Sequence, residues 1–140
     1  MPFVLSGISH HTAPIDIRER LSIAEHNLPS ALNALMEYSG VREAVLLSTC
    51  NRVEVYAIID GDSEEVAHDL LADYFARYHH LSRSEFTNCL YRKSEQEAVE
   101  HLLRVASGLD SLILGEMQIL GQVRQALKAA QETETIGSIL

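Results

Sequence analysis

The segment AVLLSTCNRVEVYAIID, residues 44–60, decides the fold, because two strand-forming stretches lie there on either side of a very short turn. Residues 44–49 are a continuous run of mostly apolar residues, which is typical of a strand buried on both faces. Residues 53–60 alternate in character and stop at an Asp-Gly-Asp turn. Only Cys50 to Arg52 separate the two stretches, so we expect a tight antiparallel hairpin with Cys50 at its tip.

Strand and helix patterns continue on both sides of this hairpin. Residues 3–8 predict a first strand and residues 87–92 a fourth. Helical spacing predicts helices over 16–22, 28–38 and 64–79, and a last one from 110 to about 131. A further helix is predicted to begin at a capping box formed by Ser94 and Glu97. The order is β-α-β-β-α-β followed by helix, which is typical of a ferredoxin-like antiparallel sheet. The expected class is therefore α+β, ferredoxin-like, with covering helices and an added C-terminal helix.

Length and composition restrict the function classes. A chain of 140 residues that is 46% apolar predicts one globular domain with a substantial core. The net charge of −9 disfavours a protein that holds nucleic acid mainly by neutralising phosphates. The two cysteines, Cys50 and Cys89, are too few for a disulfide framework and lack zinc-site spacing, which favours a reducing compartment. With no apolar run of ~18 residues and no signal peptide, we expect a cytoplasmic protein without a membrane partner.

Cys50 is the strongest candidate for chemistry. A thiol at a hairpin tip can meet a substrate, and the nearby guanidinium of Arg52 favours the nucleophilic thiolate. The other interpretation is that Cys50 is simply a small apolar residue next to ordinary turn residues. His101 is similarly open, because helix register fits both an exposed pair with Glu97 and a general acid or base near Cys50.

Cofactor motifs are absent from the sequence. Adjacent histidines, as in the pairs 10–11 and 79–80, point away from each other, so no metal site is expected. Neither G-x-G-x-x-G nor G-x-x-x-x-G-K occurs, so the chain brings no nucleotide-binding fold of its own.

Three blocks together resemble one family: GISHHTAPIDIRERLS (7–22), LSTCNRVEVY (47–56) and HLLRVASGLDSLILGEMQILGQVRQA (101–126). The resemblance is to the N-terminal catalytic domain of glutamyl-tRNA reductase, the first enzyme of five-carbon tetrapyrrole (porphyrin, haem) biosynthesis. It covers nearly the whole chain and implies that residues 1–140 are this domain, truncated before an NADPH-binding domain.

The resemblance implies an oxidoreductase with two chemical steps. Cys50 attacks the aminoacyl ester of glutamyl-tRNA(Glu) to form a thioester, which NADPH held by the absent domain reduces to glutamate 1-semialdehyde, and His101 assists. Residues matched to substrate contacts are Thr49, Cys50, Asn51, Arg52, Ser111, Glu116, Met117, Gln118 and Gln122. The same pocket is expected to include His10 or His11 and Arg18. No metal is implied, the full-length protein is expected to be a homodimer, and the product is expected to pass to the aminomutase that follows.

Two other functions fit the residues without the family blocks. The first is a Cys-His thioesterase or acyl transferase that uses Cys50 and His101 with no redox step. The second is a non-enzymatic ferredoxin-like binding module, such as a metal carrier. Carriers of that plan usually present a C-x-x-C loop, whereas Cys50 and Cys89 lie far apart in the sequence.

Overall fold

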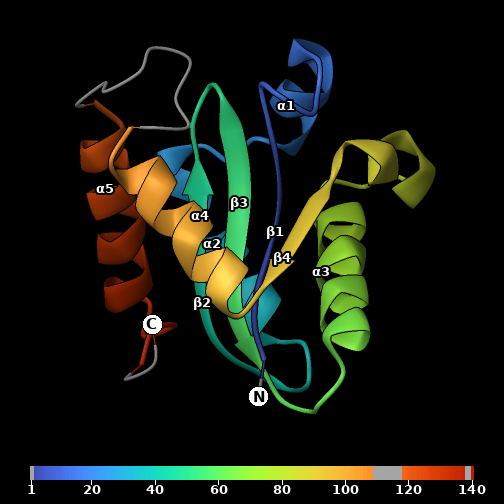
Figure 1. Ribbon diagram of the computed structural model, residues 1–140, viewed down its shortest axis with the longest axis vertical. Coiled ribbons are helices and arrows are strands. Elements are labelled where there is room, and N and C mark those ends of the chain that lie inside the picture. The colour runs from blue at the N-terminus through green and yellow to red at the C-terminus, as the bar shows by residue number, and fades with distance from the viewer. Residues whose placement is uncertain (1, 109–117, 138–139) are drawn as a thin grey trace.

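A four-stranded antiparallel sheet forms the centre of the protein, for which the computed structural model describes residues 2–108, 118–137 and 140. The strands are β1 (Phe3–Ser9), β2 (Val41–Ser48), β3 (Arg52–Ile59) and β4 (Tyr91–Ser94). Their order in the sheet is β2-β3-β1-β4, so β3 pairs with β2 on one side and with β1 on the other (Figure 1). The predicted α+β class is confirmed, while the ferredoxin-like topology stays a prediction.

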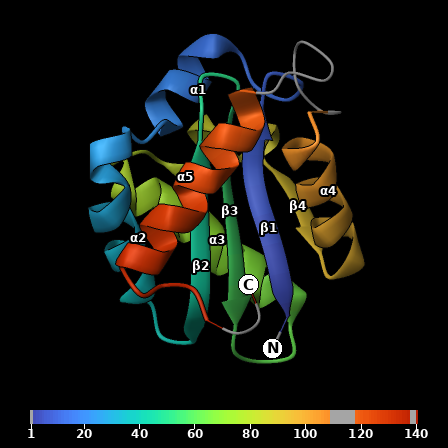
Figure 2. The same ribbon diagram turned by 90° about the vertical axis from the view of Figure 1, so that its left-hand side faces the viewer.

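Helices cover both faces of the sheet. They are α1 (Ile15–Leu21), α2 (Leu28–Met36), α3 (Glu64–Tyr78), α4 (Gln96–Ala106) and α5 (Gln118–Glu132). The helices α2 and α3 pack against one face, α4 and α5 against the other, and α1 lies beside the end at which the β2–β3 hairpin turns (Figure 2). Because the central strands are covered on both faces, every residue of β3 is buried. Within the described ranges, no helix has the length and apolar character needed to cross a bilayer.

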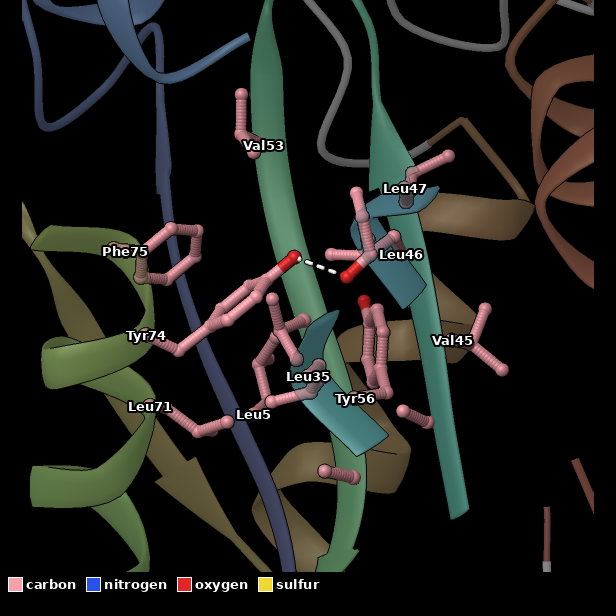
Figure 3. Close-up of a cluster of buried hydrophobic side chains, with 14 of the residues drawn as sticks. Leu5, Leu35, Val45, Leu46, Leu47, Val53, Tyr56, Leu71, Tyr74 and Phe75 are labelled. Carbon is pink, nitrogen blue, oxygen red and sulfur yellow. Dashed lines mark hydrogen bonds between the residues drawn. The ribbon is translucent and has the colours of Figure 1, made fainter. Parts of the chain in front are cut away.

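On the face of the sheet that α2 and α3 cover, the core consists of side chains from these two helices and from the strands (Figure 3). Leu71 and Phe75 of α3 and Leu35 of α2 are fully or almost fully buried against the strands. Tyr74 of α3 is also buried, and its hydroxyl donates a 2.7 Å hydrogen bond to the carbonyl oxygen of Ala31 in α2. This bond satisfies the one polar group that Tyr74 brings into the core.

The start of α4 differs from the sequence prediction. The capping box of Ser94 and Glu97 is wrong, because Ser94 belongs to β4 and its hydroxyl is hydrogen-bonded to Nε2 of His68 at 2.9 Å. The helix begins instead behind Glu95, which has a φ of 51° and whose backbone N–H donates to the carbonyl of Phe3. Sheet pairing at β1 therefore decides where α4 begins.

Other boundaries need smaller corrections. The fourth strand begins at Tyr91, because residues Thr87–Cys89 form a 3₁₀ turn, and the strand predicted from residue 44 already begins at Val41. The helices predicted over 16–22, 28–38 and 64–79 are confirmed to within two residues at each end. Of the helix predicted from residue 110, the part before Gln118 lies outside the described residues.

Gly7 provides a test of the sheet's central packing. It lies in β1 between Glu54 of β3 and Tyr91 of β4, and a Cβ there would be 2.5 Å from the carbonyl oxygen of Val53. Because a backbone atom cannot move aside easily, Gly7→Ala should lower the free energy of unfolding by about 1–3 kcal/mol, as measured by urea denaturation. The control is Gly121→Ala in α5, where nothing lies within 4 Å and alanine should stabilise the helix by up to ~1 kcal/mol. A Gly7→Ala protein as stable as the wild type would contradict this account of the packing.

Candidate active site

Cys50 lies exposed at the tip of the β2–β3 hairpin, as predicted. The turn is held by Thr49, whose Oγ1 accepts hydrogen bonds from the backbone N–H groups of Asn51 at 3.1 Å and Arg52 at 3.2 Å. The N–H of Thr49 in turn donates to the carbonyl of Arg52 at 2.8 Å. These bonds order the backbone on both sides of Cys50, so the thiol is presented from a rigid turn.

Two neighbouring segments brace the hairpin tip. Arg18 of α1 donates from Nη1 to the carbonyl oxygen of Cys50 at 3.1 Å and to Oδ1 of Asn51 at 3.4 Å. The backbone N–H of His10 donates to the carbonyl of Asn51 at 2.8 Å. The cavity beside the thiol has a volume of about 420 Å³, and its walls include Arg18, Ser48, Thr49 and Cys50. A guanidinium group therefore lies next to the candidate nucleophile.

A second group of polar side chains lies inside the protein, centred on Glu54 of β3; we call it the Glu54 network. Arg52 and Glu54 are 1% and 0% exposed, and Nη1 of Arg52 lies 3.3 Å from Oε2 of Glu54. The hydroxyl of Tyr56 donates to Oε1 at 2.7 Å, and both the hydroxyl of Tyr91 and Nε2 of His101 bond to Oε2. The network thus joins β3, β4 and α4 through one carboxylate.

The surroundings of Glu54 favour its charged form. Burial alone raises the pKa of Glu54, but the hydrogen bond and charge of His101, together with the charge of Arg52, outweigh burial and lower the pKa below its ordinary value. For Tyr56, burial and the adjacent Glu54 carboxylate raise the pKa well above its ordinary value, so this hydroxyl stays a donor. The carboxylate is therefore ionised at neutral pH and surrounded by donors.

His101 also lines a cavity of about 410 Å³ whose walls include Ser9, His11, Thr12 and Arg104. Cys50 does not line this cavity; it lines the one beside Arg18. Among the described residues, then, the two predicted catalytic side chains border different cavities. The loop that follows β1 borders the His101 cavity through its side chains and touches the hairpin tip through the backbone of His10.

The other residues predicted to contact the substrate lie in different parts of the structure. Asn51 is half-buried at the hairpin tip, and Gln122 is half-buried on α5. Arg52 directs its guanidinium to Glu54 inside the protein. Ser111, Glu116 and Met117 lie outside the described residues, as does the side chain of Gln118, and the substrate contacts of all these residues stay predictions.

Glu54 is a residue of this site that the sequence patterns did not predict. The signal that would have found it is a charged residue in the middle of the otherwise apolar stretch VEVYAII, residues 53–59. A carboxylate there is either exposed at a sheet face or buried with partners, and buried charges are almost always paired. As for metals, the described residues contain no group of three or more histidine, cysteine, aspartate or glutamate side chains suited to an ion.

A family of known proteins matches almost the whole chain. The family described as "Glutamyl-tRNAGlu reductase, N-terminal domain" matches residues 6–140. The chain belongs to this family. Among its relatives, the glutamyl-tRNA reductase of Aromatoleum aromaticum is 46% identical over 134 residues, which is 96% of this chain and 31% of that protein. The glutamyl-tRNA reductase of Neisseria gonorrhoeae is 46% identical over 140 residues, which is 100% of this chain and 32% of that protein.

A solved structure from the same family shows that the fold is shared. The glutamyl-tRNA reductase from Methanopyrus kandleri superposes with a TM-score of 0.71 and 32% sequence identity, covering 97% of this chain and 30% of that one. The chain therefore spans about a third of the length of the reductases that it matches.

The buried ion pair gives a stability prediction. Arg52→Met removes the cation but leaves a carboxylate at 0% exposure, so the free energy of unfolding should fall by about 3 kcal/mol or more in urea denaturation at neutral pH. The control is Arg42→Ala, which removes the exposed ion pair with Asp60 and should change stability little. Equal losses in the two variants would show that the Glu54 network does not hold the fold together.

Proposed function

We propose that residues 1–140 are the N-terminal catalytic domain of a longer NADPH-dependent glutamyl-tRNA reductase, which catalyses the first step of five-carbon tetrapyrrole biosynthesis. The observation that carries this proposal is an exposed thiol, Cys50, held on a rigid hairpin tip in a chain whose family match covers residues 6–140. The names of the relatives give the substrate class, glutamyl-tRNA.

In the first step, the Cys50 thiolate attacks the carbonyl carbon of the glutamyl ester. A carbon–sulfur bond forms, the bond to the terminal ribose oxygen of the tRNA breaks, and that oxygen takes a proton as the tRNA leaves. The product is a thioester on Cys50, which accepts hydride more readily than the ester did. The guanidinium of Arg18 donates to the backbone carbonyl oxygen of Cys50 at 3.1 Å and lines the same cavity as Cys50, so a positive charge lies at the hairpin tip where the ester would bind.

The second step needs a hydride that this chain does not supply. The sequence has no glycine-rich phosphate loop, so we assign NADPH to a further domain of the longer protein. NADPH bound there supplies the hydride that converts the thioester to glutamate 1-semialdehyde. The contribution of residues 1–140 is to bind the glutamyl group, form the thioester and present it.

Recognition of the glutamyl end fits the acidic character of the chain. With a net charge of −9, the domain is unsuited to gripping a tRNA backbone over a long surface. We propose that it reads the glutamyl group through placed residues, namely Thr49, Asn51, Ser111, Glu116, Met117, Gln118 and Gln122, with His101 assisting. The body of the tRNA is then left to other parts of the protein. We also propose a cytoplasmic homodimer that passes its product to the aminomutase that follows.

The thioester is directly testable. After wild-type chain is mixed with charged glutamyl-tRNA, intact-protein mass spectrometry should show a glutamyl adduct, and Cys50→Ser should abolish it. The matched control is Cys89→Ser, which changes the other, buried cysteine and should keep the adduct. A Cys50→Ser protein that is still acylated would rule out Cys50 as the nucleophile.

The division of labour with a hydride-donor domain is testable with the same chain. With glutamyl-tRNA and NADPH, residues 1–140 should form the thioester or hydrolyse it, and should release no steady stream of glutamate 1-semialdehyde. Aldehyde trapping with a colorimetric amine reagent measures this. Sustained aldehyde formation would overturn the assignment of NADPH to another domain, and rapid multiple-turnover hydrolysis would favour a thioesterase.

A further inference from the structure

A fully buried carboxylate in the central strand of a sheet is costly. Removing a charged side chain from water costs several kcal/mol, so an apolar residue would serve the core better at this position. Glu54 is 0% exposed and lies in a strand whose next-but-one neighbours on the same face are Arg52 and Tyr56. The hydrogen-bonding partners around the carboxylate explain why a charge is stable at this position.

The partners of Glu54 fix its carboxylate from three directions. Arg52 and Tyr56 reach it along β3, and Tyr91 reaches it from β4 across Gly7 of β1. The absence of a side chain at Gly7 leaves room for the side chain of Glu54. A Cβ at Gly7 would lie only 2.9 Å from Cγ of Glu54. The fourth partner is His101 of α4, and it is the one whose side chain also lines a polar cavity.

The proton positions follow from these contacts. An ionised carboxylate accepts hydrogen bonds and donates none. The Glu54 carboxylate meets the guanidinium of Arg52 and accepts from the hydroxyls of Tyr56 and Tyr91, so it is the acceptor, and Nε2 of His101 carries the hydrogen that it shares with Oε2. In a neutral imidazole only one nitrogen is protonated, so the lone pair is then on Nδ1.

We propose that Glu54 is a positioning residue that holds His101 in the Nε2–H tautomer and in one ring orientation, so that Nδ1 serves as an acceptor at the His101 cavity. A proton that arrives at Nδ1 produces an imidazolium, whose charge the Glu54 carboxylate stabilises without taking the proton itself. Whenever its imidazole is neutral, His101 is thus an acceptor at Nδ1. The link to thioester formation rests on the proposed function; the tautomer does not.

The tautomer is measured without any substrate. In the 140-residue chain labelled with ¹⁵N-histidine, two-bond ¹H–¹⁵N correlation spectra identify which ring nitrogen is protonated, and the signal missing in His101→Gln is assigned to His101. The expected wild-type pattern is Nε2–H. An Nδ1–H pattern in the wild type would overturn the proposal, and this result does not depend on whether any other variant folds.

The kinetic test compares two buried carboxylates. Glu54→Gln should lower the single-turnover rate of Cys50 acylation at saturating glutamyl-tRNA by about 10–100-fold, with the half-saturating tRNA concentration little changed. The matched control is Glu43→Gln on β2, which replaces another buried carboxylate, one that accepts the N–H groups of Gly137 and Leu140. This control should acylate at the wild-type rate. Equal rates in the two variants would overturn the role of Glu54.

The outcomes also separate this inference from the proposed function. If the wild-type chain is not acylated at Cys50 but His101 shows the Nε2–H pattern, the proposed function fails and the positioning by Glu54 stands. If acylation occurs and His101 shows the Nδ1–H pattern, the proposed function stands and the positioning fails. Alkylation of the Cys50 thiol by iodoacetamide should be unchanged in Glu54→Gln, because Cys50 lies at the hairpin tip and lines the other cavity.

Discussion

The buried ion pair between Arg52 and Glu54 is the constraint on which the centre of this protein depends. It lies in β3, the strand that pairs with both β1 and β2, at side-chain exposures of 1% and 0%. A charge so deep is stable only if its partners are held in place. The absence of a side chain at Gly7, the hydroxyl of Tyr91 and the ring of His101 all meet this requirement, so β1, β4 and α4 are tied to one carboxylate.

The same arrangement separates two kinds of chemistry. The hairpin tip holds an exposed thiol beside the guanidinium of Arg18, whereas His101 sits in the interior network and borders another cavity. From the sequence, the expected cation beside the thiol is Arg52, because it is only two residues from Cys50. Arg52 and Glu54 are two positions apart in β3 and so share one face of the strand, where the guanidinium pairs with the buried carboxylate. Arg18, from a helix distant in sequence, lies at the tip.

Much of the fold was predictable because its signals are local. The hairpin around Cys50 follows from two strand-forming runs separated by three residues, and the helix at Glu64–Tyr78 follows from an apolar stripe behind Ser63, whose side chain caps Val66. The capping box at Ser94 failed because the partner that occupies its hydroxyl, His68, is distant in sequence. Local patterns cannot anticipate such competition.

By itself, the sequence determined the α+β class, the position of Cys50 at a hairpin tip and the family, since each depends on residue types at short spacing. Only the tertiary structure decided that Glu54 is buried, that four donors surround it and that His101 is one of them. The physical reason is that β3 becomes an interior strand only after α4 and α5 cover its second face. The sequence pattern of an alternating strand is the same whether its polar side faces water or a helix. The hydrogen bond between Glu54 and His101 joins residues 47 positions apart, so no local pattern predicts it.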